Sequence, residues 1–185
     1  ANGTKIAFLR EGEIWTMDAN GKNRKKLSDT EGAIEGYKFS PDGKKVILLK
    51  SLDYHGTIKK NPSDLPLATG RLVTDMNYRH WDHYVEQISH AFVADVTENG
   101  IANVVDILKG EPYECPLAPF GGIEQLDWSI DSKLVAYTCR KKEGVDYAIS
   151  TDADIYIYNV ETKRTRNLCK PEGYKEPKID ATKSM

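Results

Sequence analysis

The sequence predicts an all-β fold built from repeated units of antiparallel strands. Tyr37–Lys50 contains two short apolar stretches around Pro41-Asp42-Gly43, whose residues favour the backbone angles of a tight turn. The pattern returns in Asp127–Tyr137, where Trp128 takes the place of the aromatic residue found 89 positions earlier. A repeated aromatic-Ser-x-Asp turn before an apolar strand is typical of propeller blades. We therefore expect part of a β-propeller, in which such units stack radially.

Length and composition fit one globular domain or a large piece of one. The chain has 185 residues, 39% of them hydrophobic, and its 26 basic and 28 acidic residues leave a net charge of −2. This balance does not favour nucleic acid as a partner. No apolar run approaches the roughly 18 residues that span a bilayer, so no membrane partner is predicted. The first residues contain no signal-peptide pattern, which we interpret as the start of a mature or excised product.

The first unit, residues 5–27, is predicted to lack its innermost strand. Asn20-Gly21 is a common hairpin turn and separates the second expected strand from the third. The unit returns near the other end of the chain, because Ile14-Trp-Thr-Met-Asp18 aligns with Ile155-Tyr-Ile-Tyr-Asn159, 141 residues later. The three expected strands are Lys5–Arg10, Glu13–Met17 and Arg24–Leu27.

Two further units are expected to be complete. Residues 34–108 supply one four-stranded blade with an insert at 51–89, and residues 123–168 supply another. Residues 170–185 are expected to connect to a following blade. The total is about two and two-thirds four-stranded blades, fewer than the four to eight that close a propeller. We therefore assign residues 1–185 to part of one larger propeller domain.

The insert differs from the blades in its sequence pattern. Its prolines, Pro62 and Pro66, indicate irregular backbone. Thr74–Ser89 follows with apolar residues near helical spacing, and Thr74 or Asp75 is available as a cap. These apolar residues are Met76, Trp81, Tyr84, Val85 and Ile88. We expect a helical insertion, and insertions between strands are places where propellers carry function.

The serines and aspartates of the repeat are expected to be structural. Ser40 and Ser129 occupy the same repeat position, which argues against either being a nucleophile. Asp42 and Asp131 stand where a turn is needed and are not expected to act in acid–base catalysis.

The three cysteines Cys115, Cys139 and Cys169 lack metal-ligand spacing. Buried or incidental thiols are our first interpretation, and one disulfide with one remaining thiol is the alternative.

The repeats and the insert resemble a known family. The segments FSPDGKKVILL and DWSIDSKLVAY resemble the TolB-like, or PD40, repeats in propellers of the prolyl oligopeptidase family. Ala68-Thr69-Gly70-Arg71 and Tyr78-Arg79-His80-Trp81-Asp82 are similar to the bacterial dipeptidyl-peptidase and acylaminoacyl-peptidase branch. The resemblance spans nearly the whole chain. It implies the N-terminal β-propeller of a serine peptidase, periplasmic or secreted, with the cytoplasm as the alternative.

The resemblance also implies that the propeller and the catalytic residues belong to two different domains. In that family the propeller caps an α/β-hydrolase domain whose serine lies on a G-x-S-x-G elbow. This sequence contains no such motif. The implied partners are therefore a C-terminal α/β-hydrolase domain and peptide substrates that the propeller admits, and the chain alone is expected to be inactive. The alternative is a non-catalytic TolB-like propeller that acts as a protein-binding module.

Candidate substrate contacts lie in the insert: Arg71, Arg79, His80 and Asp82. The planar fork of arginine suits a peptide carboxylate or carbonyl, and Asp82 or Glu86 could pair with a substrate ammonium. Salt bridges that anchor the insert on its blade are the alternative. His80 and His83 have no third ligand at a converging spacing, so we predict neither a metal nor a cofactor.

The missing blades lead to one further expectation. Both outer flanks lack a neighbour, and the strand Lys5–Arg10 should present unpaired backbone groups. We expect the isolated chain to self-associate through a blade flank or through this edge.

Overall fold

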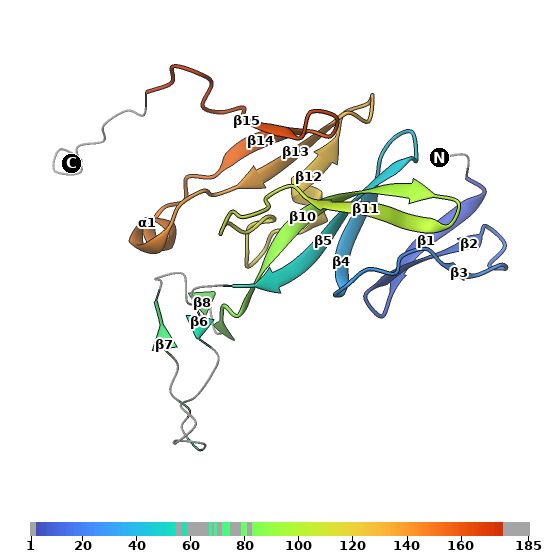
Figure 1. Cartoon of the computed structure of the whole chain (residues 1–185), viewed down its shortest axis with the longest axis horizontal. Coiled ribbons are helices and arrows are strands. Elements are labelled where there is room, and N and C mark those ends of the chain that lie inside the picture. The colour runs from blue at the N-terminus through green and yellow to red at the C-terminus, as the bar shows by residue number, and fades with distance from the viewer. Residues whose placement is uncertain are drawn as a thin grey trace.

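The computed structural model describes residues 3–54, 57–58, 67, 69, 72–74, 79–80 and 83–175. Within these residues the strands form three larger antiparallel sheets and two short strand pairs (Figure 1). The larger sheets have the strand orders β1-β2-β3, β11-β10-β5-β4 and β12-β13-β14-β15. The chain is thus all-β and forms a partial β-propeller, as the repeats predicted.

The first sheet contains the three predicted strands, β1 (Lys5–Arg10), β2 (Glu13–Asp18) and β3 (Lys25–Lys26). The predicted Asn-Gly turn separates β2 from β3. Its Gly21 has a φ of +80°, and Lys22 N donates to Asn20 Oδ1 at 3.0 Å. Glycine adopts this left-handed conformation at no steric cost, which explains why the hairpin forms here.

The second sheet contains β4 (Ile34–Phe39), β5 (Lys45–Asp53), β10 (Gln87–Thr97) and β11 (Gly100–Asp106). The repeat turn joins β4 to β5. Ser40 Oγ donates to Asp42 Oδ1 at 2.7 Å and accepts from Lys45 N at 2.9 Å, and Lys44 N donates to the same carboxylate at 3.0 Å. The serine and the aspartate therefore fix the turn, which is the structural role that their repeat position predicted.

The third sheet contains β12 (Leu126–Trp128), β13 (Leu134–Cys139), β14 (Asp154–Asn159) and β15 (Arg164–Asn167). Its turn repeats the contacts of the second sheet, with Ser129 Oγ donating to Asp131 Oδ1 at 2.6 Å and accepting from Leu134 N at 2.9 Å. Two short helices flank these strands, η1 (Ile123–Gln125) and α1 (Gly144–Ile149). Helix α1 has no counterpart among the elements expected from the sequence.

Strand β5 shows how the sheets pack. Successive side chains of a strand point to opposite faces, and both faces of β5 are buried. Val46 and Leu48 belong to the apolar layer shared with Ile14 of the first sheet. Ile47 and Leu49 belong to the layer shared with the third sheet, which includes Val135 and Tyr137. The second sheet is therefore covered on both sides, as expected of a blade between two neighbours.

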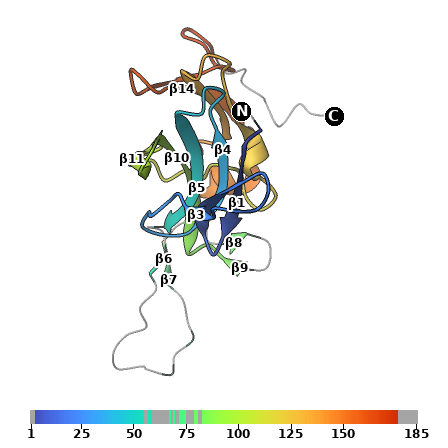
Figure 2. The ribbon, with the colours of Figure 1, turned by 90° about the vertical axis from the view of Figure 1, so that its right-hand side faces the viewer.

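The expected helix over Thr74–Ser89 is wrong. The insert contains β6 (Thr57–Ile58) paired with β7 (Leu72–Val73), and β8 (Arg79–His80) paired with β9 (His83–Tyr84). Figures 1 and 2 show these pairs near the end of β5, with β6 and β7 farther from the blades than β8 and β9. Residues 75–78 and 81–82 of the expected helix lie outside the described residues.

The last part of that segment shows why strand pairing prevails. Gln87 to Ser89 already belong to β10 and pair with Asp53 to Ser51 of β5. Tyr54 N continues the ladder by donating to Glu86 O at 2.9 Å. Val85 and Ile88 pack with Tyr54 in a small buried cluster. The apolar spacing that suggested one face of a helix is therefore explained by packing at the start of β10.

All three cysteines are free, in agreement with the first interpretation, and Cys115 and Cys139 are buried. Desolvation raises the pKa of Cys139 to about 12, so this thiol is protonated and unreactive near neutral pH. In the part of the chain that the structure describes, no helix is long and apolar enough to cross a membrane.

Candidate functional site

A cavity of about 610 Å³ lies at the foot of the insert, where the chain returns to the second sheet. One wall is formed by residues 84–89, which lead from β9 into β10. The other wall is the connection between β11 and η1, through Glu114, Pro116, Ala118, Pro119 and Gly121. The cavity thus joins the insert to the boundary between the second and third sheets.

A backbone hydrogen bond holds the two walls together. Cys115 N donates to Ser89 O at 2.8 Å, which ties the connection to β10. Within the connection, Leu117 N donates to Gln125 Oε1 at 2.9 Å and Gly121 N donates to Leu117 O at 2.7 Å. These hydrogen bonds give the connection a defined conformation, although it contains no strand. The peptide bonds before Pro116 and Pro119 are cis.

A buried carboxylate supports the second wall. Glu114 is only 3% exposed, and its Oε1 accepts a hydrogen bond from the hydroxyl of Tyr147 on α1. The guanidinium of Arg140 lies over the Tyr147 ring, 4.0 Å from its centroid, and its Nη1 donates to Ser150 O at 2.7 Å. Helix α1 thereby packs against the loop, and the hydroxyl donor compensates part of the cost of burying the carboxylate.

The cavity favours positive charge. Among the described residues that line it, Glu86 and Glu114 carry carboxylates, and there is no lysine, arginine or histidine. Glu86 is partly exposed, whereas Glu114 is buried. Tyr84, Val85 and Ile88 add apolar surface beside these carboxylates. Such a surface suits an ammonium or guanidinium group attached to an apolar stem. The cationic group can pair with an acidic side chain while the stem packs on the apolar residues, away from water.

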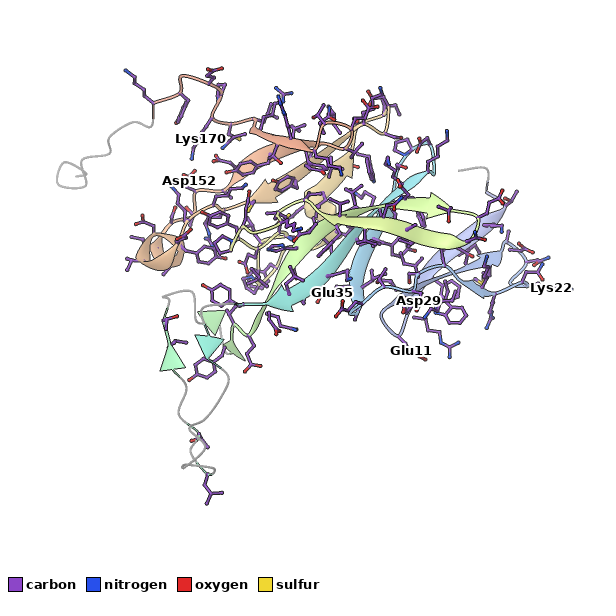
Figure 3. All side chains as sticks on the ribbon, viewed as in Figure 1. Glu11, Lys22, Asp29, Glu35, Asp152 and Lys170 are labelled. Atoms are coloured by element: carbon purple, nitrogen blue, oxygen red, sulfur yellow. The ribbon has the colours of Figure 1, made fainter. Side chains whose placement is uncertain are left out.

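A third carboxylate lies on β4, at the far edge of the second sheet from β11. Glu35 of β4 accepts from Ser89 Oγ at 3.0 Å and from Ser51 Oγ (Figure 3). These hydroxyls connect three neighbouring strands of the second sheet across the end that carries the insert. Their function is to hold the end of the sheet in register beneath the cavity.

The predicted contact residues are described only in part. Arg79 and His80 form β8 and pair with Tyr84 and His83, but the structure does not describe their side chains. Arg71 and Asp82 lie outside the described residues. The substrate-contact assignment therefore stays a prediction. Among the described residues, no group of three or more histidine, cysteine, aspartate or glutamate side chains is arranged to hold a metal ion.

Glu86 was a sequence candidate for pairing with a substrate ammonium, and the structure places it in the cavity lining. Glu114 and Tyr147 were not predicted, because they lie in segments without a repeat or motif. One signal was available, namely the Pro-x-x-Pro spacing of Pro116 and Pro119 after an isolated glutamate, which indicates an ordered loop.

Comparison with known proteins shows what the chain is similar to. No family model matches it. It is 46% identical over 172 residues to dipeptidyl-peptidase 5 of Porphyromonas gingivalis, an alignment that covers 91% of this chain and 25% of the relative. It is 36% identical over 171 residues to dipeptidyl-peptidase 5 of Porphyromonas endodontalis, with 90% of this chain and 25% of the relative covered.

One solved structure supports the fold independently. Acylaminoacyl peptidase of Pyrococcus horikoshii superposes with a TM-score of 0.54 at 16% identity, over 90% of this chain and 23% of that one. At this identity the likeness concerns the fold alone. This chain spans about a quarter of the length of the two curated relatives. The chain is a partial β-propeller whose sequence is similar to that quarter of the two dipeptidyl-peptidase 5 relatives.

Proposed function

We propose that this chain is the propeller portion of a dipeptidyl-peptidase-type serine peptidase and that its catalytic serine lies in a partner hydrolase domain. The observation that carries the proposal is the 46% identity to a dipeptidyl-peptidase 5 along 91% of the chain. The lack of a G-x-S-x-G motif supports a non-catalytic role for these residues. Because the relatives are about four times longer, the rest of such a protein has ample length for a hydrolase domain.

In this proposal the propeller covers the hydrolase domain and limits which peptides reach it. The insert and the cavity at its foot lie toward the substrate. Arg71, Arg79 and His80 contact the peptide backbone or its carboxylate, and Asp82 and Glu86 contact a positively charged group. The proposed location of the protein is the periplasm or the exterior of the cell.

The test uses the full-length peptidase and alanine variants of Arg79 and Asp82. We expect kcat/KM for a dipeptidyl reporter to fall about tenfold, which corresponds to about 1.4 kcal/mol of lost transition-state binding, while the melting temperature is unchanged. Glu86→Gln should lower kcat/KM for peptides with a basic residue and spare neutral ones. Lys22→Ala, in the β2–β3 turn far from the insert (Figure 3), is the control.

Two results would contradict the substrate role. Unchanged kinetics with a lowered melting temperature would show that the insert residues anchor the insert on its blade. A full-length protein without dipeptidyl-peptidase activity would remove the proposal as a whole and favour a protein-binding propeller.

A further inference from the structure

Two asparagines that the structure describes, Asn20 and Asn99, stand in turns before a glycine, and both are exposed. In an Asn-Gly pair the glycine N can attack the asparagine Cγ, because glycine has no side chain to hinder the approach. Ammonia leaves, a succinimide ring forms, and water then opens the ring to aspartate or isoaspartate. The reaction needs no reagent besides water, so the local conformation decides which asparagine reacts.

The turn at Asn20 orients the carboxamide for this attack. Lys22 N donates to Asn20 Oδ1 at 3.0 Å, which closes a turn through the side chain. This arrangement places Cγ on the same side of the backbone as the N of Gly21. The Lys22 N–H also polarises the Cγ carbonyl and would stabilise the negative charge that develops on Oδ1, as backbone donors do in an oxyanion hole.

The same turn has room to move. Gly21 N donates to Asp18 O at 2.8 Å, and this bond must open before the nitrogen can reach Cγ. A Cβ on Gly21 would meet nothing within 4 Å among the described residues, so no other segment blocks this side of the glycine. Figure 3 shows Lys22 at the outer end of the first sheet. An exposed turn at such a place can open locally while the rest of the fold stays intact.

The turn at Asn99, in contrast, is held on several sides. Thr97 Oγ1 donates to Gly100 O at 2.8 Å and accepts from Asn99 N at 3.3 Å. Gly100 is buried, and a Cβ on it would lie 2.7 Å from Leu27 O. Ile101 N donates to the same carbonyl at 3.0 Å. Rotation of the peptide between Asn99 and Gly100 toward the carboxamide would break these contacts.

We propose that Asn20 is a site of spontaneous deamidation in the folded chain and that Asn99 is protected. The N of Gly21 forms a bond to Asn20 Cγ, and the side-chain nitrogen leaves as ammonia with the proton of that N–H. Water then adds to the succinimide and restores a carboxylate. The inference does not rest on the proposed peptidase role.

The product would change the β2–β3 turn. Either product adds one negative charge near Asp18, and isoaspartate also lengthens the main chain by one carbon. Asp18 N donates to Lys22 O at 2.9 Å across this turn, so the longer chain should weaken the pairing of β3 with β2.

The test incubates the 185-residue chain in mildly alkaline buffer and follows deamidation by mass spectrometry of tryptic peptides. The peptide of residues 11–22 contains Asn20, and that of residues 80–108 contains Asn99. In the folded chain Asn20 should react at least about tenfold faster than Asn99. In urea that unfolds the chain, the two rates should come within about threefold of each other, because both asparagines precede glycine.

Two variants separate the causes. Thr97→Val removes the hydroxyl that holds the second turn, so it should raise the rate at Asn99 about fivefold and leave that at Asn20 unchanged. Gly21→Ala hinders the attacking nitrogen and is the negative control. Equal rates in the folded chain, or a tenfold difference that persists in urea, would overturn the proposal. So would a Thr97→Val chain in which Asn99 reacts as slowly as in the parent chain.

Discussion

Two residues of the repeat, a serine and an aspartate, build the same turn twice. The backbone N–H of Lys44 and the hydroxyl of Ser40 hold the pKa of Asp42 below its ordinary value. The hydroxyl of Ser129 and the N–H of Lys133 do the same for the pKa of Asp131. The two turns also contact each other, since Asp42 N donates to Ser132 Oγ at 3.2 Å. The ionised carboxylates therefore stabilise the folded state locally and across two sheets.

The sign of the pH dependence follows from the direction of these pKa shifts. A carboxyl whose folded-state pKa is lowered contributes stability above its unfolded pKa of about 3.9 and loses that contribution as the pH falls through the folded-state pKa. Asp42→Asn and Asp131→Asn should each be less stable than the parent chain at pH 6. This difference should shrink below about pH 4. Urea unfolding at pH 6 and pH 3 measures it, and a difference that does not depend on pH contradicts the prediction.

Among the elements, the β10–β11 hairpin links the second sheet to the first. Ile101 N donates to Leu27 O at 3.0 Å, and this close approach requires Gly100. A Cβ at position 100 would lie 2.7 Å from Leu27 O, and the residue has a φ of +134°. Gly43 also has a positive φ, of +72°, but a Cβ there meets nothing within 4 Å. Substitution of Gly43 would therefore introduce backbone strain alone, whereas substitution of Gly100 would introduce strain and a steric clash.

Gly100→Ala should therefore destabilise the chain more than Gly43→Ala. We expect about 1 kcal/mol for Gly43→Ala, from the left-handed conformation alone. Gly100→Ala should cost at least about 1 kcal/mol more, because it also displaces the hydrogen bond to Leu27. Equal free energies of unfolding in urea would show that the hairpin does not couple the two sheets.

The elements differ in how far the sequence predicts them. The strands of the first and third sheets follow from local signals, such as the Asn20-Gly21 turn and the Asp131 turn. The insert does not, because Val85 and Ile88 have a spacing that fits a helix, whereas pairing with β5 places Ile88 in β10 and leaves Val85 just before that strand. The cavity could not be predicted either. Glu86 and Glu114 line the same cavity because Cys115 N, in the loop after β11, donates a backbone hydrogen bond to Ser89 O of β10.

At the scale of the whole molecule, the outer faces of the first and third sheets, here called the two flanks, expose side chains whose counterparts in the repeat are buried. Ile14 is fully buried against the second sheet, whereas Ile155, its counterpart in the third sheet, is 43% exposed. On the opposite flank Val46 is fully buried, whereas its counterpart Ile6 is 42% exposed. Each flank thus presents apolar side chains of the kind that pack between sheets elsewhere in the chain.

These flanks lead us to predict that the isolated chain self-associates head to tail, with the Ile155 flank of one copy on the Ile6 flank of the next. Sedimentation at micromolar concentration should show concentration-dependent oligomers. Ile155→Glu should shift them to monomer, because a charge would be buried in the contact. Ile149→Glu, on the 75% exposed residue of α1, is the control and should have no effect. A stable monomer at all concentrations contradicts the prediction.

The most direct test of the account concerns catalysis, because we propose that these 185 residues form the propeller of a peptidase and contain none of its catalytic groups. The purified chain is treated with a fluorophosphonate probe and its intact mass is measured, with a known serine peptidase as the positive control. The account predicts no adduct, and no hydrolysis of a dipeptidyl reporter. Stoichiometric labelling of any serine of this chain would contradict it.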